Sequence, residues 1–522
     1  MRSPVGCAPS FGLLTALVLA GCGLGQSGIN PPVDQIFLPG GLAIDPSGHW
    51  LFVINSNNDL RFNAGTVLPL DLQRAKSHLQ SGWPECSTTH FTNDKAPETL
   101  AGTLDQPCCI DRLRPHVLNC NERAYAQADA TVQIGSFAGA TAIQAFQNPN
   151  GDFRMFMAVR ADPSITFIDV THPSGPDGPV NLRCTGPRGG PPPQARNPFC
   201  DDNWRIRRPS GAEIQDNVLP EEPHSLALDP NLGILYVGHL TIAVHGQTLA
   251  GGISTIDIAA LEDPNAPNGI SSIARVVFPT STTQGVSSLS LLDPLNLSLI
   301  DPGDPRVGDK APGRLYAVAL ASPDITEMVL QCQSPGQICD PSTPSLRDLS
   351  LVPSEQIKSS AFLPSGNDIR GFLLSSPDGN QAYVLHRNTP DVSTSTDPAA
   401  LVVLDRRLGE DGEPANLPSA ILEICSGATN MKFHDAGRGS LLFITCFEGG
   451  EIYVVDPQAP LVVAQIEAGH GPTALTFSPT DKTIAYLAEY ADNDVSVIDL
   501  APGSPTEYMV VQRLGFPHAV TE

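Results

Sequence analysis

The sequence is poor in positive charge and lacks the short catalytic signatures that can be recognised locally. Its 30 lysines and arginines stand against 55 aspartates and glutamates, a net charge of −25, which argues against nucleic acid or an anionic membrane surface as a partner. It contains no Gly-x-Ser-x-Gly, phosphate-loop, His-Glu-x-x-His or EF-hand pattern, which weakens hydrolase, nucleotide-dependent and zinc-protease interpretations. No Cys-x-x-Cys occurs, with or without a following histidine, so we expect no zinc ribbon, redox dithiol or covalent haem.

The only long apolar run lies at the N-terminus and predicts a targeting segment. Arg2 precedes an apolar stretch at 11–20 that is too short to span a bilayer. The stretch ends in Leu19-Ala20-Gly21-Cys22, which is similar to the lipobox of bacterial lipoproteins. The resemblance implies that 1–21 is a signal peptide, cleaved before Cys22, and that Cys22 carries lipid. A plain secretory signal is the alternative.

Several acyl chains on Cys22 would give a stable membrane anchor, and we expect residues 22–34 to form a flexible tether. Gly23, rather than an aspartate, follows the cysteine. By resemblance to lipoproteins, this favours the outer membrane or cell surface, with the periplasmic face of that membrane also open.

A three-part pattern of short strands recurs along the rest of the chain. Its clearest copy is 472–479, 484–488 and 493–499, and the same pattern occurs at 223–230, 234–239 and 252–257. Runs rich in Val, Ile, Tyr and Phe favour strands, and stretches such as Asp45-Pro46-Ser47-Gly48 form tight turns between them. A repeated trio of strands is typical of a β-propeller blade. Seven copies predict an all-β fold over residues 35–522: a seven-bladed β-propeller of four-stranded antiparallel blades.

The repeats resemble the YVTN family of bacterial β-propellers. Tyr236-Val237, Tyr383-Val384 and the run Asn493–Asp499 carry the resemblance. It implies a seven-bladed wheel but no particular activity, since members include surface proteins, binding proteins and propellers of redox enzymes.

The spacing of the copies predicts long loop insertions. Asp456 and Asp499 lie 43 residues apart, whereas Asp71 and Asp169 lie 98 apart. The surplus is expected in inserts near 72–130, 172–221, 260–285, 295–312 and 331–366. Such inserts either carry function or are merely tolerated at low entropic cost.

The cysteines predict an oxidising compartment. Without Cys7 and Cys22, an even number of ten remains, mostly in the inserts, which suits disulfides. We expect pairs Cys184–Cys200, Cys332–Cys339 and Cys425–Cys446. The other four, which should pair among themselves with their connectivity left open, are Cys86, Cys108, Cys109 and Cys120.

Aligning the copies brings polar residues to one mouth of the wheel, because the start of each first strand and the end of each second strand open onto the same face. The candidates for this central funnel are His224, His239, His386, His470, Glu489 and Arg370. Imidazole and carboxylate groups are ligands for copper, zinc or iron, but a polar rim without metal gives the same pattern. The sequence therefore leaves metal and cofactor open.

Three functions remain. The leading one is a non-catalytic, membrane-anchored envelope lipoprotein whose propeller is a binding or interaction scaffold for a protein or glycan. The alternative is a metal-dependent oxidoreductase or lactonase-like enzyme with its site in the central funnel, and the third is a structural subunit of an envelope complex.

Overall fold

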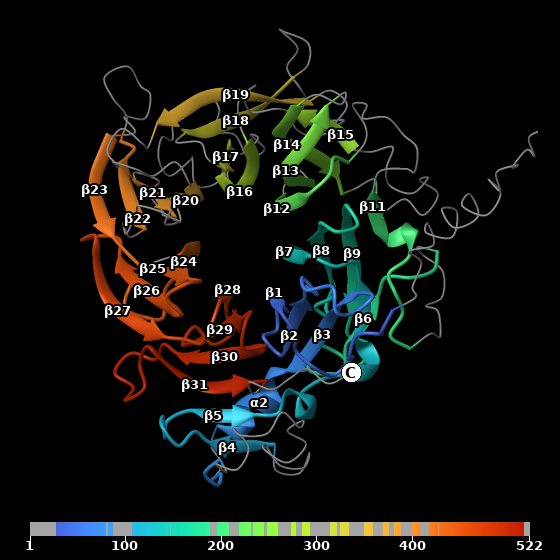
Figure 1. Cartoon of the computed structure of the whole chain (residues 1–522), viewed down its shortest axis with the longest axis vertical. Coiled ribbons are helices and arrows are strands. Elements are labelled where there is room, and N and C mark those ends of the chain that lie inside the picture. The colour runs from blue at the N-terminus through green and yellow to red at the C-terminus, as the bar shows by residue number, and fades with distance from the viewer. Residues whose placement is uncertain are drawn as a thin grey trace, which may run out of the picture.

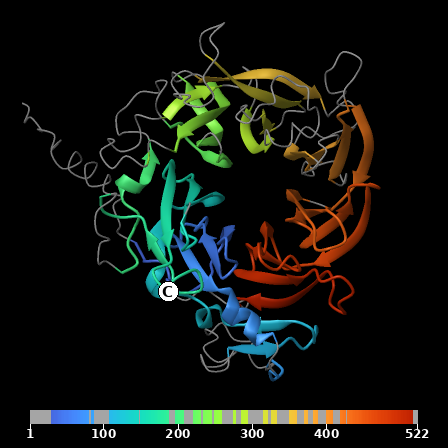
Figure 2. The same ribbon diagram turned by 180° about the vertical axis from the view of Figure 1, so that it is seen from behind.

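The chain forms seven antiparallel β-sheets arranged in a ring, which confirms the seven-bladed β-propeller (Figures 1 and 2). The computed structural model describes residues 28–79, 82–86, 107–146, 148–187, 196–207, 219–230, 233–244, 248–258, 261, 273–277, 284–292, 314–320, 324–332, 349–358, 369–374, 381–387, 399–407, 417–425 and 427–515. The signal peptide, Cys22 and the expected insert at 295–312 lie outside these residues.

Each blade is built from four strands that run outward from the ring centre in chain order. Blade 1 contains β1 (Pro39–Ile44), β2 (Trp50–Asn55), β3 (Gly65–Asp71) and β6 (Val132–Ile134); blade 2, β7 (Ala138–Ala145), β8 (Phe153–Val159), β9 (Ser164–Thr171) and β10 (Asn181–Arg183); blade 3, β12 (Pro223–Asp229), β13 (Ile234–Val244), β14 (Thr248–Asp257) and β15 (Ile273–Val277); blade 4, β16 (Gln284–Leu292), β17 (Arg314–Leu320), β18 (Asp324–Cys332) and β19 (Leu349–Lys358). Blade 5 contains β20 (Ile369–Leu374), β21 (Gln381–His386), β22 (Ala400–Asp405) and β23 (Leu417–Glu423); blade 6, β24 (Ala428–His434), β25 (Leu441–Cys446), β26 (Glu451–Asp456) and β27 (Leu461–Glu467); blade 7, β28 (Pro472–Phe477), β29 (Ile484–Glu489), β30 (Asp494–Asp499) and β31 (Met509–Leu514).

The hydrophobic core lies between neighbouring blades. The second and third strands are buried almost throughout, as in β2 and β22, because each blade packs against another on both faces. Phe52 of blade 1 meets Phe153 of blade 2 edge to face with centroids 5.6 Å apart, and Tyr383 of blade 5 meets Phe433 of blade 6 at 5.3 Å. Burying one such ring contributes about 1.5–3 kcal/mol, so the valine- and aromatic-rich runs stabilise the ring as a whole.

Every innermost strand carries a β-bulge directly after its first residue. The pairing register shifts there in β1, β7, β12, β16, β20, β24 and β28. A bulge leaves a residue without a partner on the neighbouring strand and re-aims its side chain. The positions that these register shifts skip are Gly40, Gly139, Ala140, His224, Gly285, Ser287, Arg370, Thr429 and Thr473.

Residues 28–34 of the expected tether lie against blade 1. Pro31 is buried, the carbonyl of Val33 accepts a hydrogen bond from the Thr131 hydroxyl at 2.7 Å, and Asp34 lies 3.5 Å from Arg123. The contacts order this segment, which composition alone marks as loop.

Three of the expected inserts contain outer strands and are not loops throughout. β10 lies within 172–221, β15 within 260–285 and β19 within 331–366. Short or polar outer strands carry little apolar alternation, so their pattern is hidden in the sequence. The insert at 172–221 also adds 3₁₀ helix η4 (Asp202–Trp204) and β11 (Arg205–Arg207), which pairs with β9.

The insert at 72–130 links blade 1 to blade 7. It contains helix α2 (Leu72–His78), β4 (Cys108–Ile110), β5 (Leu118–Cys120) and 3₁₀ helices η2 (Glu122–Ala124) and η3 (Ala128–Ala130). β5 pairs in parallel with β31 and antiparallel with β4, which extends blade 7 to six strands. The β4–β5 hairpin is hereafter called the clasp.

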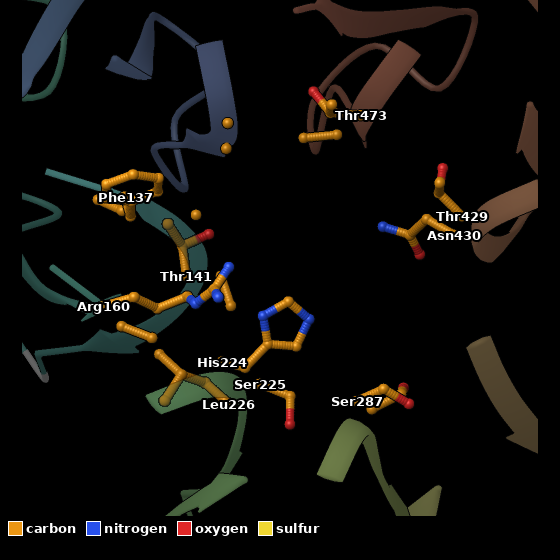
Figure 3. A pocket seen from close by; sticks show the side chains of 18 of the residues that line it. Phe137, Thr141, Arg160, His224, Ser225, Leu226, Ser287, Thr429, Asn430 and Thr473 are labelled. Carbon is orange, nitrogen blue, oxygen red and sulfur yellow. The ribbon is translucent and has the colours of Figure 1, made fainter. Parts of the chain in front are cut away.

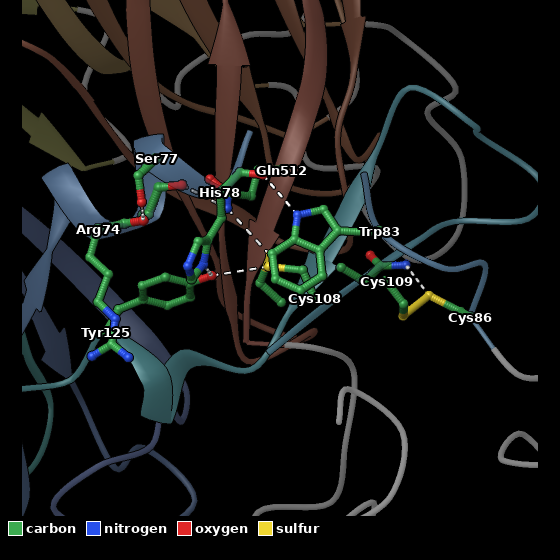
Figure 4. The surroundings of a disulfide bond; sticks show 12 residues. Arg74, Ser77, His78, Trp83, Cys86, Cys108, Cys109, Tyr125 and Gln512 are labelled. Carbon is green, nitrogen blue, oxygen red and sulfur yellow. Dashed lines mark hydrogen bonds between the residues drawn. A yellow bond between two sulfur atoms is a disulfide. The ribbon is translucent and has the colours of Figure 1, made fainter. Parts of the chain in front are cut away.

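Disulfides fix the clasp. Cys108 bonds to Cys120 across its two strands, and Cys86 bonds to Cys109, as Figure 4 shows for the latter. The side-chain amide of Gln512 on β31 donates to the Ala75 carbonyl of α2 at 3.2 Å, so helix and hairpin both hold the last strand.

Two further predicted pairs are present, Cys184 with Cys200 and Cys425 with Cys446. Of the predicted Cys332–Cys339 pair, Cys339 and the side chain of Cys332 lie outside the part of the chain that the structure describes. Among the described helices, none is long and apolar enough to cross a membrane.

Candidate functional site

A cavity of about 640 Å³ occupies the channel at the ring centre (Figure 3). Its described walls come mainly from the innermost strands of six blades: β1, β7, β12, β16, β24 and β28. The polar groups in these walls are Thr141, His224, Ser225, Ser287, Ser288, Thr429, Asn430, Lys432 and Thr473.

The bulges supply much of the lining. His224, Thr429 and Thr473 are bulge residues that line the cavity. In Figure 3 the His224 imidazole points into the cavity, with Arg160 beside it and Asn430 on the facing side. In β12, β24 and β28, the irregular start of the strand thus positions a polar side chain in the channel wall.

Glycines let the inner strands come close together on one side. A Cβ on Gly41 would lie 2.2 Å from the carbonyl oxygen of Gly139, a distance that no other residue could accommodate without backbone movement. Gly139 itself is different, because its Cβ would come no nearer than 3.6 Å to the backbone oxygen of Gly40. A side chain at Gly139 therefore has room.

The described lining of the cavity carries charge of the opposite sign to the chain as a whole. Of the lining residues that the structure describes, none is Asp or Glu, whereas Arg160 and Lys432 are cationic. Arg160 lies 3.7 Å from Glu222 in a partly exposed ion pair. The half-buried Lys432 has no hydrogen-bond or ion-pair partner among the described residues, and burial lowers the pKa of its ammonium group below the ordinary value of 10.5.

Aromatic side chains stand at the mouth. Phe447 and Tyr490 directly follow β25 and β29, and Phe137 precedes β7. Arg160 likewise directly follows β8. In blades 2, 6 and 7, the residue just beyond the second strand, and not its last residue, therefore reaches the channel.

His239 was expected in the funnel but is enclosed within blade 3. It is fully buried, and its Nδ1 lies 3.0 Å from the Glu221 carbonyl, to which it donates. Nε2 must then accept from the Ser254 hydroxyl at 2.9 Å. Burial lowers the pKa of His239 to about 4, against a smaller rise from the Glu221 hydrogen bond. It is a neutral structural histidine.

Glu489 and His386 are also buried away from the cavity. Glu489 is wholly buried, accepts a hydrogen bond from the Ser496 hydroxyl at 2.7 Å and pairs in register with Asp494. Burial, and then the neighbouring Glu489 charge, raise the pKa of Asp494 well above its ordinary value. His386 ends β21 with 1% exposure and is not part of the described lining.

His470 and Arg370 complete the predicted set. The His470 side chain is 85% exposed, and its Nδ1 lies 2.9 Å from Asp492. Arg370 occupies the bulge position of β20, but its side chain lies outside the described residues.

The funnel hypothesis therefore needs correction. Of the five candidates with described side chains, only His224 lines the channel. The alignment identified the correct mouth, since β12 begins opposite His239 and β28 begins opposite Glu489. The second strand, however, lies one strand away from the channel, so its last side chain packs inside the blade. Among the described residues, no three His, Cys, Asp or Glu side chains are grouped to hold a metal ion.

Sequence reasoning missed Lys432 and Arg160. One signal could have found Arg160: it directly follows a second strand, as Phe447 and Tyr490 do, and all three line the cavity. Lys432 lies in the middle of its strand, and no such signal marks it.

No protein-family model matches this chain, and no curated protein matches it in sequence. Among solved structures it is similar to Kuenenia stuttgartiensis hydrazine synthase, at 13% identity and a TM-score of 0.47, over 90% of this chain and 97% of that one. It is similar to the Pseudomonas aeruginosa periplasmic gluconolactonase PpgL, at 14% identity and a TM-score of 0.42, over 83% and 86%. It is also similar to the dihydro-heme d1 dehydrogenase NirN, at 11% identity and a TM-score of 0.40, over 94% and 66%. Likeness at this distance carries no functional argument, because propellers host unrelated functions.

Proposed function

We propose that this chain is a membrane-anchored envelope lipoprotein whose propeller is a scaffold that binds a small polar solute in its central channel. The observation that carries the proposal is the lining of the cavity, where hydroxyl, amide, imidazole and cationic groups from six blades surround one space of about 640 Å³. Cavities of about 300–1,000 Å³ with convergent polar groups are the usual form of a small-molecule site.

The location part of the proposal rests on the Leu19-Ala20-Gly21-Cys22 motif. A lipid on Cys22 would hold the wheel at the outer membrane, with residues 23–27 as the shortened tether. The disulfides within the described chain support an oxidising compartment.

Fractionation tests the anchor. Cys22→Ala should move the full-length protein from the membrane to the soluble fraction, whereas Cys7→Ala, which alters a cysteine of the same signal segment, should leave it membrane-bound. A Cys22→Ala protein that stays in the membrane fraction would show that lipidation does not anchor the chain.

A channel plug tests the binding role. Gly139→Phe should fill the cavity, because Gly139 lines it and has room for a side chain. Gly82→Phe is the matched control, since nothing lies within 4 Å of a Cβ at Gly82. Thermal-shift screening of polar solutes against the full-length protein should find ligands that stabilise wild type and Gly82→Phe but not Gly139→Phe. If no solute distinguishes the plugged variant, the channel is not a binding site.

A further inference from the structure

The strongest electrostatic feature of the channel is a cation that no described residue neutralises. Lys432 lies on β24, paired in register with Phe443 of β25, and its side chain borders the cavity. Lys432 is half-buried, so its ammonium group has less water around it than a surface lysine has, and an anion beside it would be favourable.

The rest of the lining adds to the same preference. Arg160 brings a second positive charge to the mouth, partly offset by Glu222, and the described lining contains no carboxylate. The chain as a whole carries −25, so a positive cavity stands out from an acidic exterior. Field lines concentrate in such a cleft, which favours a small anion that can enter and disfavours a large polyanion that would meet the exterior.

The uncharged lining indicates what accompanies the anionic group. Thr429, Asn430 and Ser287 offer hydroxyl and amide groups that can donate and accept, which suits a ligand rich in hydroxyls. Phe447 and Tyr490 at the mouth present aromatic surfaces that pack against the apolar face of a ring.

We propose that the channel binds a small hydroxylated anion, a sugar acid or sugar phosphate, with Lys432 as the group that pairs with its negative charge. The inference rests on the proposed binding function and narrows it to one ligand class. Carboxylate and phosphate share the chemistry that Lys432 recognises, so the test includes both.

The test compares galactose with two anions that each differ from it only at C6. Isothermal titration of the full-length protein with galacturonate, galactose 6-phosphate and galactose should show binding of one or both anions, with galactose weaker by about tenfold or more, because hydrogen bonds to a charged group are stronger than neutral ones. The arm that binds more tightly identifies the anionic group. Galactose that binds as tightly as both anions would overturn the ligand class while leaving channel binding intact.

Variants test the residue. Lys432→Met should weaken anion binding about tenfold or more, whereas Lys432→Arg keeps the charge and should retain part of it. Lys482→Met, on the exposed surface, should bind as wild type does. The melting temperature of Lys432→Met should equal or exceed that of wild type, because an unpaired cation is replaced by an apolar chain, which separates a binding role from a structural one.

Three further results would overturn the inference. Lys432→Met could bind the anions as wild type does, or it could melt well below wild type with Lys432→Arg unable to restore stability. The third result is that none of the three probes binds, while other solutes in the screen do distinguish wild type from Gly139→Phe. The proposed function fails separately, when no solute at all distinguishes those two proteins.

Discussion

The backbone N–H of Leu38 donates a hydrogen bond to Oδ1 of Asn493 at 2.8 Å, across 455 positions of sequence. Asn493 immediately precedes β30 and adopts φ 59°, a left-handed conformation that asparagine tolerates. A second bond, 3.0 Å from the Thr473 hydroxyl to the Pro39 carbonyl, lies at the same seam. Side-chain hydrogen bonds thus join blades 1 and 7. Neither blade contributes a strand to the four strands that make up the other.

Loss of the seam hydrogen bond should weaken the ring. Asn493→Gly keeps the left-handed conformation but removes the acceptor, and should cost about 1–2 kcal/mol of unfolding free energy. Asn493→Ala also forces an unfavourable φ and should cost about 1 kcal/mol more. Urea unfolding of both variants measures this difference. Wild-type stability for Asn493→Gly would mean that water replaces the bond without loss.

The clasp should stabilise blade 7 in particular. Replacing Cys108 and Cys120 by serine removes one clasp disulfide and should cost about 2–4 kcal/mol. Because β5 pairs with β31, amide protons of 509–515 should exchange faster in this variant. The matched control replaces Cys184 and Cys200, a pair of similar sequence separation in blade 2. Equal exchange of 509–515 in both variants would contradict the clasp's role.

His239 should make stability depend on pH. Its pKa of about 4 in the folded chain lies below the ordinary 6.5, so between these values the unfolded chain binds a proton that the folded chain does not. Stability should therefore fall as pH falls from 6.5 to 4, by up to about 3 kcal/mol at this site. His239→Gln can keep the hydrogen bonds without titrating and should show a smaller fall. Urea unfolding at several pH values measures it, and an NMR titration of His239 near pH 6.5 would refute it.

Asp494 should act in the opposite sense. Burial and the Glu489 charge raise its pKa in the folded chain, so the folded state binds the proton more tightly than the unfolded state does. The stabilisation is present below pH 3.8 and is lost as pH rises through the folded pKa. Asp494→Asn, which stays neutral, should gain stability relative to wild type as pH rises from 4 to 9.

Asp481→Asn provides the comparison for Asp494. Burial favours a higher pKa for Asp481, but hydrogen bonds from Lys76 and Thr483 outweigh it, and the net pKa is lowered. The Asp481→Asn variant should therefore be less stable than wild type at neutral pH and as stable as wild type in acid. Thermal melts across pH should show the two variants diverging from wild type in opposite directions, and parallel profiles would contradict both assignments.

The sequence predicts the blades well because their information is local. Turn residues and runs rich in Val and Ile predict the ends of strands such as β13, which contains Tyr236, to within a few residues. The clasp has no such local signal, because β5 pairs in parallel with a strand almost 400 residues later in the sequence. Nothing in the sequence of residues 107–120 indicates that partner. The sequence predicts the site only in part. Aligning the copies identifies the mouth of the channel, but it does not separate His224 on the first strand of blade 3 from His239 on the second. His224 lies at a bulge and faces the channel, whereas His239 ends the second strand in the register pairing and is buried inside the blade. Strand periodicity does not contain this distinction.

The pairing of β5 with β31 also sets an order of events as the exported chain folds. Cys120 and Gln512 are 392 residues apart, so in N-terminus-first export the hairpin enters the oxidising compartment well before its partner strand. Its two disulfides span only 12 and 23 residues and can close before that strand arrives. We therefore expect the hairpin to be fixed early and the last strand to pair with it afterwards, so that completion of the wheel depends on the residues that are exported last.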